Sequence, residues 1–554
     1  MVRGGRGLWM LGITVVAALL FLPGLGAVHL FDWDEINFAE IAREMITTGD
    51  HLRPQIDYQP FWEKPPLFIW MQVVSMRWAG VNAFAARLPN AVCGILALLV
   101  LFRIGDMLRG KGFGLLWVLA YMGSILPHLY FRSGIIDPWF NLLIFLALYF
   151  FILLTWGDPA RTEGMANRER GGYAAASGLF LGLAILTKGP VALLLAGLTI
   201  SVVWAMGRFR PMVGRRSLMV FVITTILVAS SWFIIDLVRN GPWFVVTFIK
   251  YQWRLFSTPD AGHGGFPGYH FVVLLLGCFP ASLFAVRELL KPLPGDPHQK
   301  DFRRWMVVLL CVVLVLFTLV KSKIVHYSSL AYYPLTYLAA LNMQAIWRGG
   351  RKAGIGLRIA IGLVGGVFAL ASILLPVVGM HPELIKPYFA MDAFAMANLE
   401  APVVWTGWET LAGVWLLLTL AFSIFWLEGN DRRWGLLTLF GGTAVYVALA
   451  LMVSINKIEG YSQNAAITFF QQRQGERCYV ITKGYKSYAQ FFYTRKPPAT
   501  DARAHDEEWL LHGAIDRPVY IVTKVTSADE VRRIPGVEEL YTANGFVFFE
   551  RKVP

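Results

Sequence analysis

The sequence predicts a polytopic α-helical membrane protein that ends in a small soluble α/β domain. Of its 554 residues, 56% belong to the hydrophobic set AVILMFWYC, only 16% are charged, and the mean hydropathy is +0.53. A soluble chain carries about 25% charged residues, so this composition excludes a set of water-soluble domains. The apolar residues gather in runs of about 20, enough to cross a hydrocarbon core of roughly 30 Å. The segment 456–554 differs, because it is richer in charge and has short β-type runs.

The first apolar run, at about 8–28, follows Arg3 and Arg6. A signal peptide also begins in this way, but the run is long and lacks a convincing A-x-A site, so we expect an uncleaved first span. A shorter run at 65–78 opens with two prolines and is predicted to be a helix lying at the membrane interface. Further runs bring the prediction to about thirteen spans; they lie near 89–108, 113–131, 138–156, 173–187, 190–206, 217–237, 271–290, 305–320, 327–346, 356–376, 402–427 and 434–454.

The distribution of Lys and Arg predicts the orientation of these spans. With the N-terminus in the cytoplasm, the cytoplasmic segments hold about 23 of the 50 Lys and Arg residues, while the longer outer segments hold about 13. The outer loops are then about 29–88, 238–270 and 377–401, within a membrane domain at 1–455. The formal net charge of +14 is mostly this orientation signal, so a nucleic-acid partner is excluded.

The C-terminal segment, 456–554, is predicted to be a soluble α/β domain on the outer side. Strands are expected at 477–482, 518–523 and 545–550, where β-branched and aromatic residues gather. Helices are expected between them, at 487–493 and 527–533. The domain has no cluster of acids and bases, so we interpret it as a scaffold or an acceptor-docking module.

The four cysteines are scattered through the chain and form no CxxC pair. A disulfide framework or a zinc ribbon is therefore not indicated. The cysteines are Cys93, Cys278, Cys311 and Cys478.

Acidic residues open the first outer loop. Asp32, Asp34 and Glu35 stand at the start of a predicted helix, only a few residues after the first span. Acids in a first turn can cap a helix and interact with its dipole. That role explains one acid easily and two or three less well, so we predict a catalytic or binding role for Asp34 or Glu35.

Basic residues near the outer ends of the spans break the positive-inside trend. Any one of them could be an anchor whose charged end reaches toward the interface. Together they indicate an anionic ligand at that depth, because charges near hydrocarbon are costly without a partner or a cavity. They are Lys64, Arg132, Lys188, Arg254, Lys321 and Lys323.

The outer loop 238–270 is rich in Gly and contains His263 and His270. Its length and composition are typical of a mobile lid. Its histidines could contribute to a metal site with Glu63, but no local spacing requires one.

Carboxylates beside an acceptor hydroxyl can act as a general base, and clustered cations can stabilise a phosphate leaving group. Together, at the depth of lipid headgroups, they predict transfer of a group from a lipid-linked phosphate. A non-catalytic transporter of a lipid-linked sugar would use a similar basic cavity. We disfavour it because the charges gather on one face and the sequence shows no internal repeat, whereas many transporters are built from inverted repeats.

Six motifs, in order along the chain, resemble the GT-C membrane glycosyltransferases. The similarity is to the branch that contains the aminoarabinose transferase to lipid A and the protein O-mannosyltransferases. It covers essentially the whole chain. The motifs are Asp34-Glu35 with Phe38-Ala39-Glu40-Ile41-Ala42-Arg43-Glu44-Met45, Glu63-Lys64-Pro65-Pro66-Leu67, Arg87-Leu88-Pro89, Ile136-Asp137-Pro138, Leu186-Thr187-Lys188-Gly189-Pro190 and Lys323-x-x-His326-Tyr327.

The resemblance implies a GT-C fold in the bacterial inner membrane and inverting transfer of one sugar from a polyprenyl-phosphate donor on the periplasmic side. The acceptor would be lipid A or another envelope glycolipid, or a protein as in the O-mannosyltransferases. Asp34 would be the catalytic carboxylate, with the choice between Asp34 and the additional acid Asp32 slightly open. Asp137 would be a second acid of the active site, orienting the acceptor or binding metal.

The resemblance also implies residues for the donor and for a metal. Lys64, Arg254 and Tyr327 would bind the donor phosphate, and we add Lys188, Lys323 and Arg132 as further candidates. Glu63 and His263 correspond to zinc ligands of the aminoarabinose branch. Gly264 stands where that branch has a second histidine, which puts the zinc in question.

Overall fold

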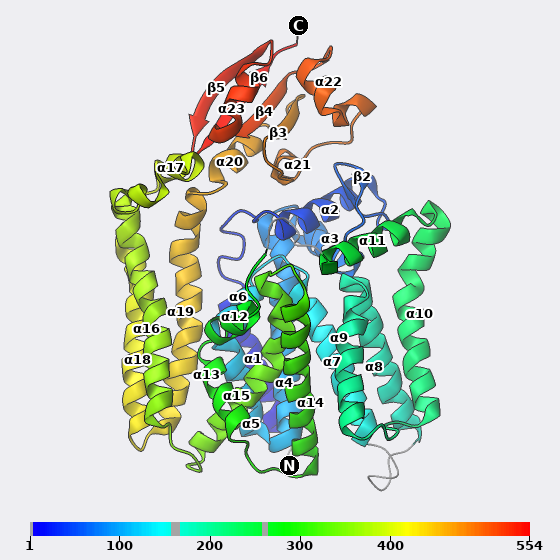
Figure 1. Ribbon diagram of the computed structural model, residues 1–554, viewed down its shortest axis with the longest axis vertical. Coiled ribbons are helices and arrows are strands. Elements are labelled where there is room, and N and C mark those ends of the chain that lie inside the picture. The colour runs from blue at the N-terminus through cyan, green and yellow to red at the C-terminus, as the bar shows by residue number, and fades with distance from the viewer. Residues whose placement is uncertain (1–3, 157–166, 258–263, 554) are drawn as a thin grey trace.

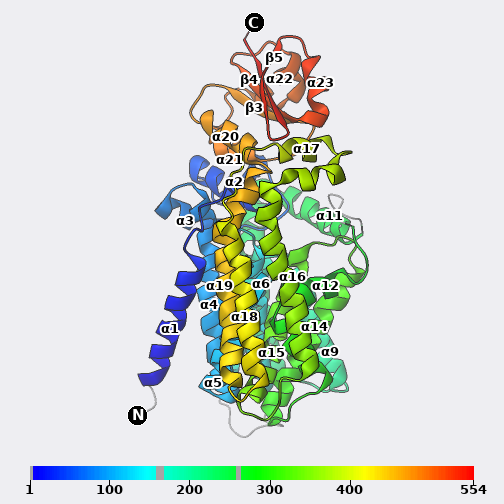
Figure 2. The same cartoon turned by 90° about the vertical axis from the view of Figure 1, so that its left-hand side faces the viewer.

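The computed structural model describes residues 4–156, 167–257 and 264–553. Long helices run side by side and form a bundle (Figure 1). The N-terminus lies at one end of the bundle, and the C-terminal sheet lies beyond the other end. The view at right angles shows the same arrangement (Figure 2).

Within the described residues, seven helices are long and apolar enough to cross a membrane, or eight if one bent pair counts as a span. The chain is therefore a multi-pass membrane protein. Thirteen spans stays a prediction. The seven are α4 (Ala83–Arg109), α7 (Asp137–Trp156), α10 (Arg215–Asn240), α14 (Pro297–Leu319), α16 (Ile355–Met380), α18 (Leu411–Glu428) and α19 (Arg432–Gly460).

Other helices complete the bundle. Three are apolar stretches of 10–17 residues: Gly5–Phe21 within α1 (Gly4–Phe21), α5 (Lys111–Met122) and α9 (Val191–Met206). Helix α8 (Asn167–Lys188) packs between α7 and α10, and α15 (Tyr332–Trp347) is buried along nearly its whole length.

Two apolar runs that the sequence predicts as single spans are broken. The run 113–131 divides into α5 and α6 (Ile125–Tyr130) at Gly123, where a Cβ would lie 2.4 Å from the carbonyl oxygen of Phe440 in α19. The run 271–290 divides into α12 (Tyr269–Gly277) and α13 (Ala281–Leu290), which are bent by 115°. Pro280 lies at this bend and has no N–H to continue the helical ladder.

Short elements cover the end of the bundle nearest the C-terminal sheet. They are α2 (Asp34–Thr48), a hairpin of β1 (Gln55–Ile56) and β2 (Gln59–Pro60), α3 (Leu67–Ala79) and α11 (Trp243–Ser257). Helix α3 lies across the ends of the long helices (Figure 1), where an interfacial helix is predicted. Helix α11 occupies much of the loop that is predicted to be a lid, and the rest of that loop includes residues outside the described ranges.

The residues after α19 form a four-stranded sheet in the order β3-β4-β6-β5, with β3 and β4 parallel and the other pairs antiparallel. The three predicted strands are confirmed as β3 (Tyr479–Lys483), β4 (Val519–Lys524) and β6 (Phe546–Arg551). Strand β5 (Val537–Ala543) is missed by the sequence because it is an exposed edge strand rich in polar residues. The predicted helices are confirmed, slightly shortened, as α21 (Ala489–Thr494) and α23 (Ala528–Arg532), and two more, α20 (Asn464–Gln472) and α22 (Glu507–His512), flank the sheet.

The C-terminal region packs tightly on the membrane domain. One hydrophobic cluster joins Ile36 and Phe38 of α2 to Ile467 and Phe470 of α20 and to Phe548 of β6. Helix α19 continues to Gly460, past the predicted domain boundary at 455/456. The third outer loop forms two 3-10 turns, at Pro382–Leu384 and Lys386–Phe389, and α17 (Ala393–Leu399), which contacts the sheet through Phe394 and Phe546.

Candidate active site

Two acids from distant parts of the sequence open helices at the same end of the bundle. Asp34 is the first residue of α2, and Asp137 is the first residue of α7. The N-cap residue of α2 is Trp33, which makes no side-chain capping bond. The side chain of Asp34 is 38% exposed and that of Asp137 only 3%. Asp34 is therefore open to a substrate, whereas Asp137 is buried behind it.

Lys188, the last residue of α8, neutralises the buried acid. Its Nζ donates a 2.6 Å hydrogen bond to Oδ1 of Asp137 and lies 5.4 Å from the centre of the Tyr327 ring. The two opposite charges compensate each other at low exposure, and removal of either partner would leave the other charge buried and unpaired. The structure thus brings together three residues that the sequence singles out: Asp137, Lys188 and Tyr327.

His326 lies between the two acids. Its Nε2 is 3.7 Å from Oδ2 of Asp34 and 3.9 Å from Oδ2 of Asp137, both longer than a hydrogen bond. Burial lowers the pKa of His326, against the opposing effect of the Asp137 carboxylate, which favours a neutral ring. Oδ2 of Asp137 has no hydrogen-bond partner in the described part of the chain. His326 belongs to the motif Lys323-x-x-His326-Tyr327, but the sequence alone assigns it no role. Its position between two apolar runs, beside Tyr327, is the signal from which a role could have been predicted.

Lys64 provides a second cation near these acids. Burial lowers its pKa, and among the charges that act on it are Glu63, Asp34, Lys188 and Asp137. We call Asp34, Lys64, Asp137, Lys188 and His326 the acid–base cluster.

Tyr251 of α11 links Lys64 to Arg254. The Lys64 ammonium and the Arg254 guanidinium each lie 5.2 Å from the centre of the Tyr251 ring. The Tyr251 hydroxyl donates a 3.2 Å hydrogen bond to Glu63. Helix α11 therefore holds one predicted phosphate ligand beside another, through a tyrosine that sequence reasoning missed.

Glu35 has a structural position that does not fit the predicted catalytic role. Its carboxylate accepts two hydrogen bonds from Arg87, of 3.0 and 2.7 Å, and others from the backbone N–H groups of Phe31 and Gly134. Both partners of the ion pair are buried. The Arg87 charge and these hydrogen bonds outweigh burial and lower the pKa of Glu35. The carboxylate is saturated by the protein and has no free face for a substrate.

Two predicted phosphate ligands are also bound to the backbone. Nζ of Lys323 donates to the carbonyl oxygens of Phe317, Thr318 and Val320 at the end of α14. Arg132 donates to Leu20 and Pro23 at the end of α1. Cations near helix C-termini satisfy carbonyls that lack intrahelical partners. The geometry therefore favours a structural role for Lys323 and Arg132 over donor binding.

The predicted metal ligands are only partly described. Glu63 is in the structure, and His263 lies outside the described residues. Among the residues that are described, no group of three or more His, Cys, Asp or Glu side chains is arranged to hold a metal ion. The zinc prediction stays untested.

The segment just before Asp34 is held by the C-terminal region. The backbone N–H of Leu30 donates to the Tyr493 hydroxyl at 2.7 Å, and Gln463 donates to the Leu30 carbonyl at 2.6 Å. Asp32 accepts a short hydrogen bond from Ser487, and burial raises the pKa of Asp32 to about 6. This contact gives the additional acid Asp32 a different environment from that of Asp34.

Comparisons with known proteins agree with this architecture. Residues 63–235 match the family described as dolichyl-phosphate-mannose-protein mannosyltransferase. The undecaprenyl phosphate-alpha-4-amino-4-deoxy-L-arabinose arabinosyl transferase of Pectobacterium carotovorum is 25% identical over 83% of this chain and 78% of its own. That of Aeromonas hydrophila is 26% identical over 76% and 72%.

Solved structures share the fold. The crystal structure of ArnT from Cupriavidus metallidurans bound to undecaprenyl phosphate matches with a TM-score of 0.77 and 20% identity over 98% of both chains. The apo form matches with a TM-score of 0.73 and 19% identity, over 99% of this chain and 98% of the other. Both matches extend over the membrane domain and the C-terminal region together.

Proposed function

We propose that this chain, a membrane glycosyltransferase of the GT-C family, transfers one sugar from a polyprenyl-phosphate donor to lipid A or another envelope glycolipid. The observation that carries the proposal is the acid–base cluster, in which an accessible carboxylate stands beside a neutralised buried one and a second lysine. The relatives named above act on undecaprenyl phosphate-linked aminoarabinose, which supports a donor of that class.

Asp34 is proposed as the general base. Its carboxylate would take the proton of the acceptor hydroxyl while that oxygen attacks the anomeric carbon of the donor sugar. In the same step the bond between the anomeric carbon and the phosphate oxygen breaks, which inverts the configuration. Asp137, paired with Lys188, is proposed to act on His326 through its charge, because the two side chains are 3.9 Å apart and form no hydrogen bond.

Lys64 and Arg254, with Tyr251 between them, are proposed to bind the donor phosphate together with Tyr327, which lies beside Lys188. The leaving polyprenyl phosphate gains negative charge as its bond to the sugar breaks. Cations fixed in advance stabilise this charge more than they stabilise the ground state, and so lower the barrier.

The proposed orientation places the acid–base cluster and residues 456–554 in the periplasm of a bacterium. Helix α2, which begins at Asp34, and the C-terminal sheet lie at the same end of the bundle, away from the N-terminus (Figure 1). Within the membrane domain, the segments assigned to the cytoplasm hold more Lys and Arg residues than the longer outer loops, as the positive-inside rule requires.

The test of this function is Asp34→Asn in reconstituted protein supplied with a polyprenyl-phosphate sugar. Transfer should fall by about 10² to 10⁴, the range for loss of a general base, while binding of the donor persists. Mass spectrometry of lipid A from a deletion strain should show loss of one sugar. Unchanged transfer by Asp34→Asn would refute the assignment of the base.

A protein acceptor is the second candidate, and the match of residues 63–235 to protein mannosyltransferases favours it. Periplasmic glycoproteins from the same deletion strain distinguish the two. Loss of a glycan from proteins, with lipid A unchanged, would show that the acceptor is a protein.

A zinc ion held by Glu63 and His263 remains part of the proposal. No step above passes through it. Metal analysis of the purified protein and of Glu63→Gln tests it directly, because one zinc per chain should disappear in the variant.

A further inference from the structure

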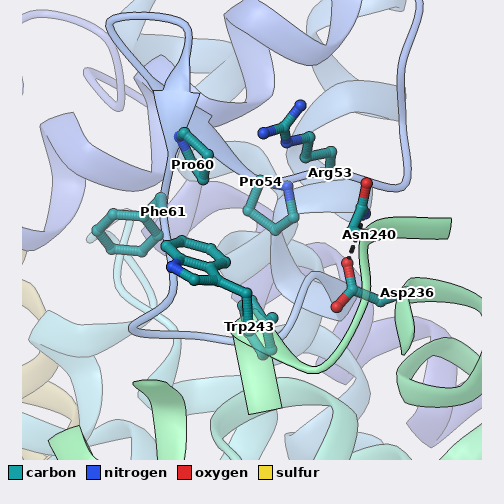
Figure 3. Close-up of a pocket in the computed structure, with 8 residues that line it drawn as sticks. Arg53, Pro54, Pro60, Phe61, Asp236, Asn240 and Trp243 are labelled. Atoms are coloured by element: carbon teal, nitrogen blue, oxygen red, sulfur yellow. Dashed lines mark hydrogen bonds between the residues drawn. The ribbon is translucent and has the colours of Figure 1, made fainter. Parts of the chain in front are cut away.

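A cavity separate from the acid–base cluster lies beside the chain segment that leads to Glu63 and Lys64. It has a volume of about 280 Å³ and is lined by side chains that include Arg53, Phe61, Asp236, Asn240, Trp243 and Phe244. Figure 3 shows the polar group, Arg53 with Asp236 and Asn240, on one side, and the Phe61 and Trp243 rings on the other. This space suits a small polar group rather than a whole lipid.

The polar wall contains a buried carboxylate with a free oxygen. Asp236 is only 3% exposed. Its Oδ1 accepts a 2.8 Å hydrogen bond from Asn240, and its Oδ2 has no hydrogen-bond partner among the residues described. A buried carboxylate oxygen without a partner is costly. A ligand that brings a cationic donor would satisfy it.

The remaining walls favour a ligand with two opposite charges. Arg53 is exposed where it lines the cavity, and a guanidinium binds phosphate through two parallel hydrogen bonds. Trp243 and Phe244 present aromatic surfaces, which attract an ammonium group through the electrons of the ring face. One small cavity thus combines features that recognise an ammonium with one that recognises a phosphate.

The position of the cavity indicates the source of such a ligand. Asp236 and Asn240 lie in the last turn of α10, and only 11% of the apolar window of α10 is buried within the protein. Apart from the side that packs on α8, much of α10 is exposed and apolar, as expected of a helix surface that contacts lipid. Trp62 packs edge-on against Trp243 at a ring distance of 5.4 Å, as interfacial aromatic residues do. The cavity is therefore at headgroup depth in the outer leaflet.

We propose that this cavity binds a zwitterionic phospholipid headgroup, a phosphodiester that carries a primary amine. Asp236 takes the ammonium and Arg53 the phosphate. Because Phe61 forms part of the wall and Trp62 packs on Trp243, a bound headgroup would brace the loop that leads to Lys64.

The probe is dihexanoyl phosphatidylethanolamine, titrated into the full-length protein in detergent and followed by native mass spectrometry. Dihexanoyl phosphatidylglycerol, which lacks the amine, should bind at least tenfold more weakly. Asp236→Asn should remove this preference, and Arg53→Gln should weaken binding of both lipids. The matched control is Arg239→Gln. Arg239 is an exposed arginine of the same helix that does not line the cavity, so its substitution should change neither the affinity for the two lipids nor the preference for the amine.

Three results would overturn the proposal. Equal binding of the two lipids by the unmodified protein would exclude recognition of the amine, whether or not any variant folds. A preference that survives Asp236→Asn would place the amine elsewhere. Free phosphorylethanolamine that binds as tightly as the lipid would assign the cavity to a soluble phosphoamine instead of a membrane lipid.

Discussion

Asp34 and Glu35 are adjacent carboxylates that the fold uses in different ways. Asp34 is partly exposed and faces His326, whereas Glu35 is buried in a bidentate pair with Arg87. From the sequence, both Asp34 and Glu35 are candidates for a catalytic role, because neither the composition nor the motif distinguishes the two carboxylates. The distinction arises from Arg87, which is distant in the sequence and whose contact with Glu35 only the tertiary structure shows.

Glu35→Gln should therefore destabilise the protein. Removing one partner of a buried ion pair leaves the other charge uncompensated and costs about 3–5 kcal/mol. Thermal unfolding in detergent should show a clear loss of melting temperature for this variant. Asp34→Asn is the matched control and should retain its melting temperature while losing transfer. Equal melting temperatures for the two variants would contradict the structural role of Glu35.

His326→Gln should lower kcat and leave donor binding almost unchanged. The imidazole lies between the two acids, 3.7 Å from Asp34 and 3.9 Å from Asp137, whereas the donor phosphate is assigned to other residues. We expect a loss of about 10² or more, the lower end for a group that assists proton transfer. Single-turnover kinetics with donor titration separates the two effects. His381→Gln, in an outer loop where His381 pairs with Glu383, is the control and should be fully active.

At the scale of elements, hydropathy predicts much of the fold. Apolar runs indicate the long helices, and β-branched clusters predict β3, β4 and β6. The breaks at Gly123 and near Pro280 are missed, because an apolar composition does not reveal a bend. Helix α11 is missed because glycines nearby in its loop suggest an irregular segment.

The candidate site, like the fold, is predicted only in part by the sequence. Charged residues near the ends of apolar runs predict Asp34, Lys64, Asp137 and Lys188, which the fold brings to one end of the bundle. The same criterion also selects Lys323, although that side chain binds backbone carbonyls. The sequence gives the depth of a charge and its sign, but the partner of each charge depends on helix packing.

The contact between the first outer loop and the segment before α21 should make stability depend on pH. The raised pKa of Asp32, about 6 against a usual 3.8, results from burial. Protonated Asp32 thus contributes stability that is present below pH 3.8 and is lost as the pH rises through about 6. In Asp32→Asn the melting temperature should exceed that of the unmodified protein by an amount that grows up to about pH 6 and then stays constant.

Ser487→Ala gives the check on that prediction. The Ser487 hydrogen bond lowers the pKa of Asp32, so its removal should move the pH transition upward. A melting temperature whose pH dependence is the same in Asp32→Asn and in the unmodified protein would contradict the role of Asp32.

At the scale of the whole molecule, residues 456–554 hold the segment that precedes Asp34. Tyr493 and Gln463 hold Leu30, four residues before Asp34. A small displacement of a catalytic group costs much of the rate. Tyr493→Phe combined with Gln463→Ala should lower kcat by about tenfold or more and leave donor affinity unchanged.

Tyr541→Phe is the matched control for this pair. Its side chain lies on the exposed edge strand β5, against Phe469 and Phe548, and not on the first outer loop. It should have full activity in the same assay. Full activity of the double variant as well would show that the C-terminal region does not position Asp34.

The hydrogen bond from Leu30 to Tyr493 also has a consequence for the order in which the structure can form during synthesis. Its two ends are 463 residues apart. The first outer loop emerges from the ribosome early, but its partner emerges near the end and, in the proposed orientation, must first cross the membrane. Contacts between distant residues form slowly, because a long loop must close before they gain energy. A nascent chain stalled before Gln463 would thus already contain Asp34, yet the loop that carries Asp34 would lack its contacts with Tyr493 and Gln463.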